Sequence, residues 1–280
     1  MVGVLTWVNG AIVPDGWPAL SARDHGVTVG DGVFETVKVL DGVPFALTRH
    51  LQRLERSAAG LSLPIDLATV RAGVETILDA AARTTGPPRA RLRMTVTGGP
   101  GPLGSNRGES IPTVIVALSE LASWPATAEV VTVPWTRNER AATVGLKTIS
   151  YADNVVALAY AHAHGAAEAV FANTRGMVCE GTGSNVFVGI GGRLVTPPLD
   201  SGPLPGITRE LLLLWLGDVE EGDLPIAALA DADEVFLASS TRDVQPVACV
   251  DGRPLSATPG PLTARAAEVF AARAGEDPDP

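Results

Sequence analysis

The stretch Gly145-Leu-Lys-Thr-Ile-Ser-Tyr151 contains one of only two lysines among the 280 residues of this chain. The other lysine is Lys38, and the remaining 19 basic residues are arginines. Coding bias can explain an excess of arginine, but it does not explain where the two lysines lie. Lysine can lose its proton when buried, and only a neutral amine can attack a carbonyl to form a Schiff base. Lys147 is therefore the first candidate for covalent chemistry.

Composition and charge favour a globular protein that acts on small molecules. A chain of 280 residues allows one large domain or two of ordinary size, and the net charge of −10 argues against a nucleic-acid partner. The longest apolar run, near Leu211 to Leu216, is far shorter than the ~20 residues of a membrane span. The N-terminus lacks the pattern of a secretory signal, so we expect a cytoplasmic location and no membrane partner. The two cysteines and four histidines lack metal-ligand spacing, so no metal site is expected.

The order of predicted elements indicates an α/β chain with two domains. The small N-terminal domain, 1–119, is expected to contain strands at 6–8, 32–40, 44–46, 89–97 and 112–119, and helices at 48–58 and 67–83. An Asp-Gly turn at 41–42 predicts a hairpin. Thr48 is the expected N-cap of the first helix, which puts Arg49 in its first turn.

A linker at 120–128, which contains Pro125, is expected to lead into the larger C-terminal α/β domain, 129–280. There we expect strands at 129–134, 168–172 and 234–239, and helices at 153–164, at 206–217 and from 263. The Asp- and Pro-rich tail is expected to fray.

The stretch Gly99-Pro-Gly-Pro-Leu-Gly104 formally matches the glycine fingerprint of dinucleotide-binding proteins. That fingerprint requires a helix to begin inside it, and Pro100 and Pro102 favour a loop instead. We therefore expect a rigid loop beside a pocket.

Four other segments supply what pyridoxal phosphate requires of a protein. Besides an amine for its aldehyde, this cofactor needs a carboxylate at its ring nitrogen and a cradle of cations and N–H groups for its phosphate. Glu180 is the candidate carboxylate. The cradle can come from Arg49, from the helix N-terminus at Gly206-Ile-Thr-Arg, and from the hydroxyls of Ser239-Ser-Thr-Arg.

The order of these motifs resembles the fold-type IV pyridoxal-phosphate enzymes. This family comprises branched-chain aminotransferases, D-amino-acid aminotransferases and aminodeoxychorismate lyases. The similarity extends from about Asn9 to Ala267. The motifs, in order, are Gly30-Asp-Gly-Val-Phe-Glu-Thr, Arg49-His-Leu-Gln-Arg-Leu, Lys147, Glu180-Gly-Thr-Gly-Ser-Asn, Leu204-Pro-Gly-Ile-Thr-Arg and Ser239-Ser-Thr.

The resemblance implies an α/β (α+β) fold of two domains with the cofactor between them. It implies that Lys147 forms the internal aldimine and carries the proton of the 1,3-shift, that Glu180 pairs with the pyridine nitrogen, and that Leu204 lies against the ring. The other cofactor residues that it implies are Arg49, Ser184, Asn185, Gly206, Ile207, Thr208, Ser240 and Thr241. It also implies a homodimer in which residues 98–108 are the loop borrowed by the partner.

The residues that bind the substrate carboxylate are harder to predict. D-amino-acid aminotransferases of the familiar type carry an Arg-x-His pair in the borrowed loop, and this chain has no histidine between His50 and His162. Strand alternation sends Phe34, Thr36 and Lys38 to one face, and Glu35 and Val37 to the other. The expected substrate-binding residues are Phe34, Thr36, Lys38, Arg93 and Thr182.

These observations predict a transaminase that moves an amino group from D-amino acids, and from simple (R)-amines, to a 2-oxo acid such as pyruvate or 2-oxoglutarate. Glu35 matches the aminotransferase form of the early strand, whereas Thr36 also fits the form in aminodeoxychorismate lyases, which release p-aminobenzoate and pyruvate. The D-amino-acid transaminase is the favoured interpretation, and the lyase, a branched-chain L-amino-acid aminotransferase and a pyridoxal-phosphate-binding protein without catalytic activity remain alternatives.

Overall fold

The computed structural model describes residues 3–84 and 86–280, and the chain splits into two compact units. Unit 1 consists of Met1–Ala122, Leu146–Ser150 and Pro278–Pro280, and unit 2 of Ser123–Gly145 and Tyr151–Asp277. The two short pieces of unit 1 are distant in sequence from the rest of it. One of them contains Lys147, which the sequence prediction assigned to the C-terminal domain.

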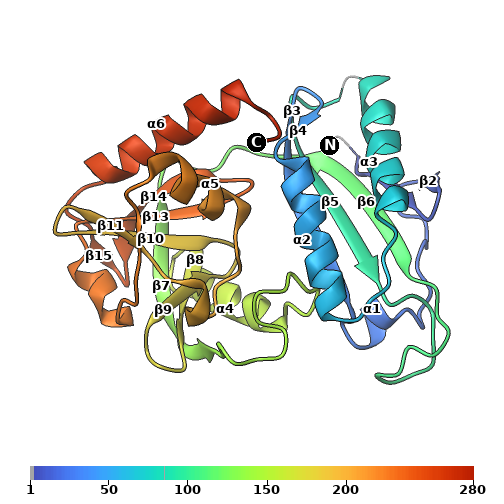
Figure 1. The fold of residues 1–280 in the computed structure, drawn as a ribbon, viewed down its shortest axis with the longest axis horizontal. Helices are drawn as coiled ribbons and strands as arrows, with labels where there is room; N and C mark the ends of the chain where they lie inside the picture. The colour runs from blue at the N-terminus through green and yellow to red at the C-terminus, as the bar shows by residue number, and fades with distance from the viewer. Residues whose placement is uncertain (1–2, 85) are drawn as a thin grey trace. The chain divides into compact units, whose positions relative to one another are not determined.

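Unit 1 is an antiparallel sheet with two helices on one face (Figure 1). The six strands follow the order β2-β1-β6-β5-β3-β4, and apolar side chains of α2, α3 and the sheet form one core. The elements are β1 (Leu5–Val8), β2 (Ala11–Val13), α1 (His25–Thr28), β3 (Gly32–Leu40), β4 (Val43–Pro44), α2 (Leu47–Gly60), α3 (Leu67–Ala82), β5 (Arg89–Thr97) and β6 (Thr113–Glu120).

The alternation predicted for β3 is present in this unit. Val33, Val37 and Val39 belong to the core beneath the helices, and Glu35 contacts α2 from the same face. Phe34 lies on the opposite face, where Thr36 is paired in register with Arg93 of β5. A single strand therefore supplies both the core and a polar face with one aromatic ring.

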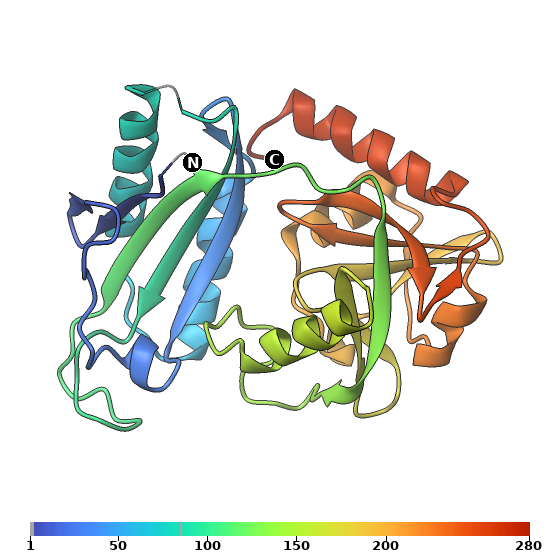
Figure 2. The same cartoon turned by 180° about the vertical axis from the view of Figure 1, so that it is seen from behind.

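Unit 2 is built on a larger mixed sheet, seen from behind in Figure 2. Its strands follow the order β12-β11-β10-β13-β14-β7-β8-β9, and β15 pairs with β14. Helix α4 packs on β7 and β8, while α5 and α6 pack against each other and on β13.

The elements of unit 2 are β7 (Ala128–Arg137), α4 (Ala152–Ala163), β8 (Glu168–Asn173), β9 (Val178–Gly181), β10 (Asn185–Ile190), β11 (Arg193–Thr196), η1 (Leu199–Ser201), α5 (Ile207–Leu216), β12 (Glu220–Glu221), η2 (Ile226–Asp231), β13 (Glu234–Ser239), β14 (Asp243–Val250), β15 (Arg253–Pro254) and α6 (Pro261–Glu276). In the part of the chain that the structure describes, no helix is both long and apolar enough to span a membrane.

Two predictions about chain ends and caps are wrong. Helix α2 begins at Leu47, and Ala46 occupies the N-cap position with a positive φ of 54°, so Thr48 is not the cap. Asp279 supplies the missing acceptor, because its carboxylate receives the Thr48 N–H at 2.8 Å and the Thr48 hydroxyl at 2.6 Å. The tail is therefore docked on α2, with Pro278 O accepting the Ala46 N–H at 2.7 Å, and is not frayed.

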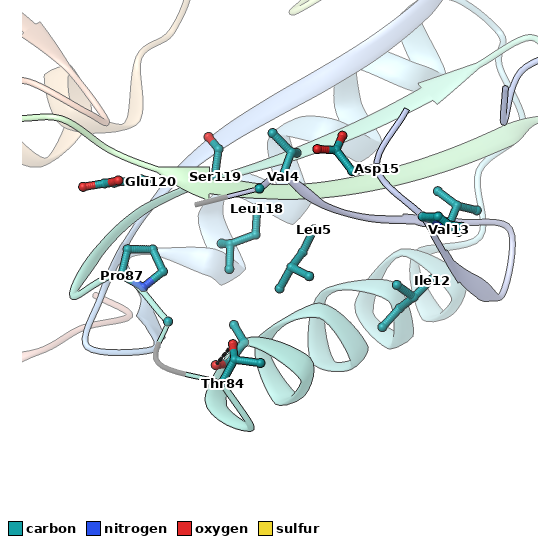
Figure 3. Close-up of a pocket in the computed structure, with 14 residues that line it drawn as sticks. Val4, Leu5, Ile12, Val13, Asp15, Thr84, Pro87, Leu118, Ser119 and Glu120 are labelled. Atoms are coloured by element: carbon teal, nitrogen blue, oxygen red, sulfur yellow. Dashed lines mark hydrogen bonds between the residues drawn. The ribbon is translucent and has the colours of Figure 1, made fainter. Parts of the chain in front are cut away.

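An apolar cavity of about 530 Å³ lies in unit 1 beside β1, β2 and the end of α3 (Figure 3). Val4, Leu5, Ile12 and Leu118 contribute apolar walls, and Asp15 and Glu120 contribute carboxylates. The described residues that line it include none of those predicted to bind cofactor or substrate. The cavity is therefore not part of the candidate site.

Candidate functional site

Lys147 lies on a short extended segment beside β3. Its carbonyl accepts the Phe34 N–H at 3.0 Å, and its own N–H donates to the Ser57 hydroxyl of α2 at 3.1 Å. The backbone of Lys147 is thus fixed between a strand and a helix of unit 1. Its ammonium nitrogen lies 4.3 Å from the centroid of the Phe34 ring.

The Phe34 ring brings a second cation close to Lys147. The guanidinium carbon of Arg93 lies 3.8 Å from the same ring centroid, which is a cation–π contact. Arg93 also donates to the Thr95 hydroxyl at 3.3 Å. Lys38 is buried and its ammonium lies 5.4 Å from a different ring, that of Phe45. Arg93, one of the two predicted substitutes for the Arg-x-His trap, therefore shares an aromatic contact with Lys147.

The motif Arg49-His-Leu-Gln-Arg-Leu directs its two arginines to different surroundings. Arg49 donates from Nε to Pro280 O at 2.6 Å. Arg53, one turn later, is buried and donates to both carboxylate oxygens of Glu35 at 2.7 Å. His50 lies 2.7 Å from the same carboxylate through Nδ1. The sequence prediction named Arg49 alone and missed Arg53.

The Glu35 carboxylate is ionised although it is fully buried. Burial opposes ionisation, but the charge and hydrogen bonds of Arg53, with those of His50, outweigh it and lower the pKa of Glu35 to about 2. Burial also lowers the pKa of His50 below its ordinary value, and the positive charge of Lys147 acts in the same direction. Ser57, one turn after Arg53 on α2, binds the Lys147 backbone.

In unit 2, the Glu180 carboxylate is held from two sides. One oxygen accepts the Leu204 N–H at 2.9 Å, and the other lies 3.3 Å from Nε of Arg137. Arg137 packs over the Phe171 ring at 4.3 Å and donates to the side-chain oxygen of Asn154. Sequence reasoning missed Arg137, because the pairing joins β7 to β9 across more than forty residues.

The N-terminus of α5 has the properties of an anion site. Its cap residue is Gly206, and no side chain in the described residues caps the helix. A Cβ at Gly206 would lie 1.9 Å from Oδ1 of Asn185, so a larger residue there would have to displace the Asn185 side chain or the start of the helix. Asn185 in turn donates to Leu204 O at 2.9 Å, and Thr208 is buried in the first turn. The N–H groups and the dipole of such a helix end favour a phosphate.

The turn after β9 and the turn after β13 contain the remaining predicted residues. Ser184 is buried, and its hydroxyl has no hydrogen-bond partner among the described residues. Thr182 is buried and hydrogen-bonded to Glu168, while Ser240 and Thr241 form the turn between β13 and β14. An unsatisfied buried hydroxyl in the turn that follows Glu180 fits a site built for a polar ligand.

The loop at 98–108 contains no helix and is anchored within unit 1. Arg107 donates to both oxygens of Asp31, at 2.5 and 2.6 Å, and to the carbonyls of Leu61 and Ser62. The hydrogen bond to Asp31 raises the pKa of Arg107 above its ordinary value. Leu103, within the loop, is 80% exposed. The absence of a helix agrees with the rejection of a dinucleotide fingerprint.

Comparison with known proteins identifies the family. Residues 32–250 match the family model for class IV aminotransferases. A putative branched-chain-amino-acid aminotransferase of Methanocaldococcus jannaschii is 33% identical over 259 residues, which cover 88% of each chain. A bifunctional aminodeoxychorismate lyase / D-amino acid transaminase of Mycobacterium tuberculosis is 32% identical over 298 residues, which cover 94% of this chain and 95% of the relative.

The fold is likewise similar to solved structures. A hypothetical aminotransferase from Mycobacterium tuberculosis in its PLP-bound form superposes with a TM-score of 0.83 at 30% identity, covering 96% of this chain and 98% of the other. The chain belongs to the class IV aminotransferase family, and pyridoxal phosphate is its cofactor. The predicted fold-type IV architecture and the predicted cofactor are confirmed.

Proposed function

We propose that the chain is an aminotransferase whose donors are D-amino acids, with simple (R)-amines as weaker donors and a 2-oxo acid as acceptor. The observation that carries this proposal is the Phe34 ring, which has the amine of Lys147 4.3 Å from its centroid and the guanidinium of Arg93 3.8 Å from it. A cation close to the reactive amine can hold a substrate carboxylate. Charge-assisted hydrogen bonds of this kind are about twice as strong as neutral ones.

Pyridoxal phosphate, when bound, supplies the electron sink that stabilises negative charge on the carbon bearing the amino group. In the proposal, Lys147 binds the cofactor through Nζ and moves the substrate proton. Glu180 holds the proton on the ring nitrogen, and its geometry is fixed by the Leu204 N–H and by Arg137. Because an amide cannot hold that proton as a carboxylate does, Glu180→Gln is expected to slow transamination while the cofactor stays bound.

The phosphate is assigned to the N-terminus of α5, with Ile207, Thr208, Ser240 and Thr241, and to a cation on α2. Arg49 is the predicted cation, and we add Arg53 as a second candidate. Ser57, one turn after Arg53, binds the backbone of Lys147, so Arg53 lies on the helix face nearer to the lysine. Replacing Arg49 by alanine and measuring cofactor retention tests the predicted cation. Arg53 is tested with Arg53→Lys, because Arg53→Ala removes the counter-charge of the buried Glu35 carboxylate.

The choice between transaminase and lyase cannot depend on Glu35. Its carboxylate is fully engaged by Arg53 and His50, so its presence follows from the charge balance inside unit 1 and not from the reaction. Thr36, paired with Arg93 on the Phe34 face, keeps the lyase as a second candidate. The relative whose name carries both activities supports a D-amino-acid substrate and the lyase equally.

We also propose a cytoplasmic homodimer in which the loop at 98–108 approaches the partner's site. The exposure of Leu103 and Ile111, each 80%, supports a surface that is covered by another chain. Size-exclusion chromatography with light scattering would measure the mass in solution. A monomer with full activity would contradict the borrowed loop.

The activity itself is tested with a panel of donors: D-alanine, D-glutamate, L-leucine, (R)-phenylethylamine and aminodeoxychorismate. We expect keto acid from the D-amino acids, and less from the amine. Formation of p-aminobenzoate alone would establish the lyase, and exclusive use of L-leucine would establish the branched-chain enzyme. If no donor changes the visible spectrum of the bound cofactor, the chain is non-catalytic.

Arg93→Leu tests the carboxylate assignment within the same panel. The variant should raise KM for D-alanine roughly tenfold and leave KM for (R)-phenylethylamine nearly unchanged, because only the amino acid loses a charge-assisted contact. Arg91→Leu is the matched control, since Arg91 lies on the same strand face and is also exposed. Equal effects of both variants on both donors would refute the assignment.

A further inference from the structure

A buried carboxylate that the proposed chemistry does not use lies at the first residue of β8. Glu168 is only 1% exposed. One carboxylate oxygen accepts hydrogen bonds from the Thr182 hydroxyl and from the Gly183 N–H, the latter at 2.9 Å, and the other accepts from the guanidinium of Arg242. Buried carboxylates are costly unless they are paired and hydrogen-bonded, and this one is satisfied at both oxygens.

The partners of Glu168 come from two separate turns of unit 2. Thr182 and Gly183 belong to the turn after β9, between Glu180 and Ser184. Arg242 belongs to the turn between β13 and β14, directly after Ser240 and Thr241. Strand pairing connects only the ends of these turns: β10, which begins at Asn185, pairs with β13 at Ala238. The carboxylate of Glu168 adds a side-chain link between the turns themselves.

The side chain of Arg242 is itself held in place. It is 7% exposed, donates to the side-chain oxygen of Gln245 at 2.8 Å, and packs 4.0 Å from the ring of Trp124. Gln245 donates in turn to Pro125 O at 2.8 Å. Because Arg242 has so little freedom, its ion pair with Glu168 fixes the position of the turn that carries Ser240 and Thr241.

We propose that Glu168 is a positioning residue that sets the spacing between the phosphate turn, 240–242, and the ring-nitrogen turn, 180–185. The inference rests on the proposed function, which assigns Thr241 to the phosphate and Glu180 to the ring. The proposal predicts that loss of Glu168 changes the affinity of some ligands more than that of others. A ligand that contacts both turns depends on their spacing, whereas a ligand that contacts one turn does not.

Glu168→Gln tests this, because the amide keeps the size of the side chain but leaves the charge of Arg242 without its counter-ion. Apo protein is titrated with pyridoxal phosphate, and inorganic phosphate and pyridoxal are measured as competitors. We expect the Kd for pyridoxal phosphate to rise roughly tenfold, while the binding of either fragment changes less than twofold. Arg242→Lys, which keeps the charge but shortens the reach, should give a smaller loss with the same pattern.

Glu234→Gln is the matched control. Glu234 is also buried and begins β13, and its carboxylate accepts the N–H groups of Leu262 and Thr263 at 3.0 and 2.7 Å. It lies at the end of β13 opposite Ser239, so its loss should lower the urea midpoint but leave the Kd for pyridoxal phosphate unchanged. Equal losses of affinity in the Glu168 and Glu234 variants would overturn the proposal.

Two further outcomes are decisive. If inorganic phosphate is weakened as much as pyridoxal phosphate in Glu168→Gln, the residue supports one turn only and the proposal fails. Thr241→Val separates this from an error in the proposed function, because it should weaken both phosphate and pyridoxal phosphate. If Thr241→Val weakens neither, the assignment of the phosphate turn is wrong.

Discussion

Helices α2 and α5 begin with nearly the same residues, Leu47-Thr48-Arg49 and Ile207-Thr208-Arg209, yet their N-termini differ in what they bind. At α2, Asp279 accepts the N–H and hydroxyl of Thr48, and Arg49 donates to Pro280 O. At α5, no side chain of the described residues caps the helix, and Arg209 turns away to Glu221 and to Pro197 O.

The difference shows that a helix start is an anion site only if the rest of the chain leaves it open. In α2 an internal carboxylate already takes the place that a phosphate would take. In its next turns α2 contacts Glu35 through His50 and Arg53, and it contacts the Lys147 backbone through Ser57. The proposed function assigns the first turn of α5 to the phosphate.

The largest expected effect comes from the second turn of α2. Arg53→Ala should lower the free energy of unfolding by about 3–5 kcal/mol, because it leaves the buried Glu35 carboxylate without its main counter-charge. Arg49→Ala should cost much less, since Arg49 is only partly buried. Urea denaturation of both variants measures the difference. Equal losses would show that the motif's two arginines are structurally equivalent.

The same cluster predicts a pH dependence. The pKa of Glu35 in the folded chain is about 2, below its ordinary value of 4.5, so its contribution to stability is present above pH 4.5 and is lost as the pH falls toward 2. In Glu35→Gln, the decrease in the free energy of unfolding between pH 4.5 and 2 should be smaller than in the wild type by about 3 kcal/mol. If the variant loses as much stability as the wild type between pH 4.5 and 2, Glu35 is not the group that causes the pH dependence.

Gly206→Ala should weaken pyridoxal phosphate binding by roughly a hundredfold. The added Cβ would meet Asn185 Oδ1 at 1.9 Å and displace the start of α5, and small displacements at a binding site can cost this much. Gly217→Ala, at the other end of the helix, has a φ of 73° and should lower stability without affecting the Kd. Comparable Kd values for the two variants would refute the role of the α5 N-terminus.

Thr208→Val and Thr48→Val give the most direct comparison of the two helices. Loss of the Thr208 hydroxyl should raise the Kd for pyridoxal phosphate roughly fivefold, whereas loss of the Thr48 hydroxyl should change stability and not affinity. Equilibrium titration and urea denaturation of the same two variants provide both readouts. A reversed pattern would assign the phosphate to α2.

The smallest expected effect is that of Asp279→Asn. Removing the acceptor at the α2 N-terminus should lower the free energy of unfolding by up to about 1 kcal/mol, as for other helix caps. The Kd for pyridoxal phosphate should stay the same. Tighter cofactor binding in this variant would mean that Asp279 and the phosphate compete for the N-terminus of α2.

Local sequence signals predict much of the fold. The strands at 89–97 and 234–239 are predicted at their observed bounds, because alternation and flanking turns act over short distances. The grouping of Lys147 with unit 1 and the docking of Asp279 on α2 could not be predicted. Both depend on contacts between residues about 90 to 230 positions apart in the sequence, which no local pattern encodes.

Residues of the candidate site are likewise predictable where a local sequence pattern marks them. Alternation along β3 correctly separates Phe34 from Glu35, and the helix-start pattern locates Gly206. Arg53 was missed although a signal existed: a glutamate on the core face of a strand requires a buried cation, and Arg53 lies on the apolar face of α2. No local sequence pattern marks Arg137 or Glu168, because their partners are distant in the sequence and are brought close only by the folding of the sheet.

The most direct test of the proposed chemistry is the site of covalent attachment. Borohydride reduction of the protein with bound pyridoxal phosphate, followed by peptide mapping, has only two possible lysine targets, Lys147 and Lys38. We predict the pyridoxyl group on Lys147, whose amine lies beside Phe34, and none on Lys38, which is buried against Phe45. Recovery of the group on Lys38, or wild-type turnover by Lys147→Ala, would contradict this assignment.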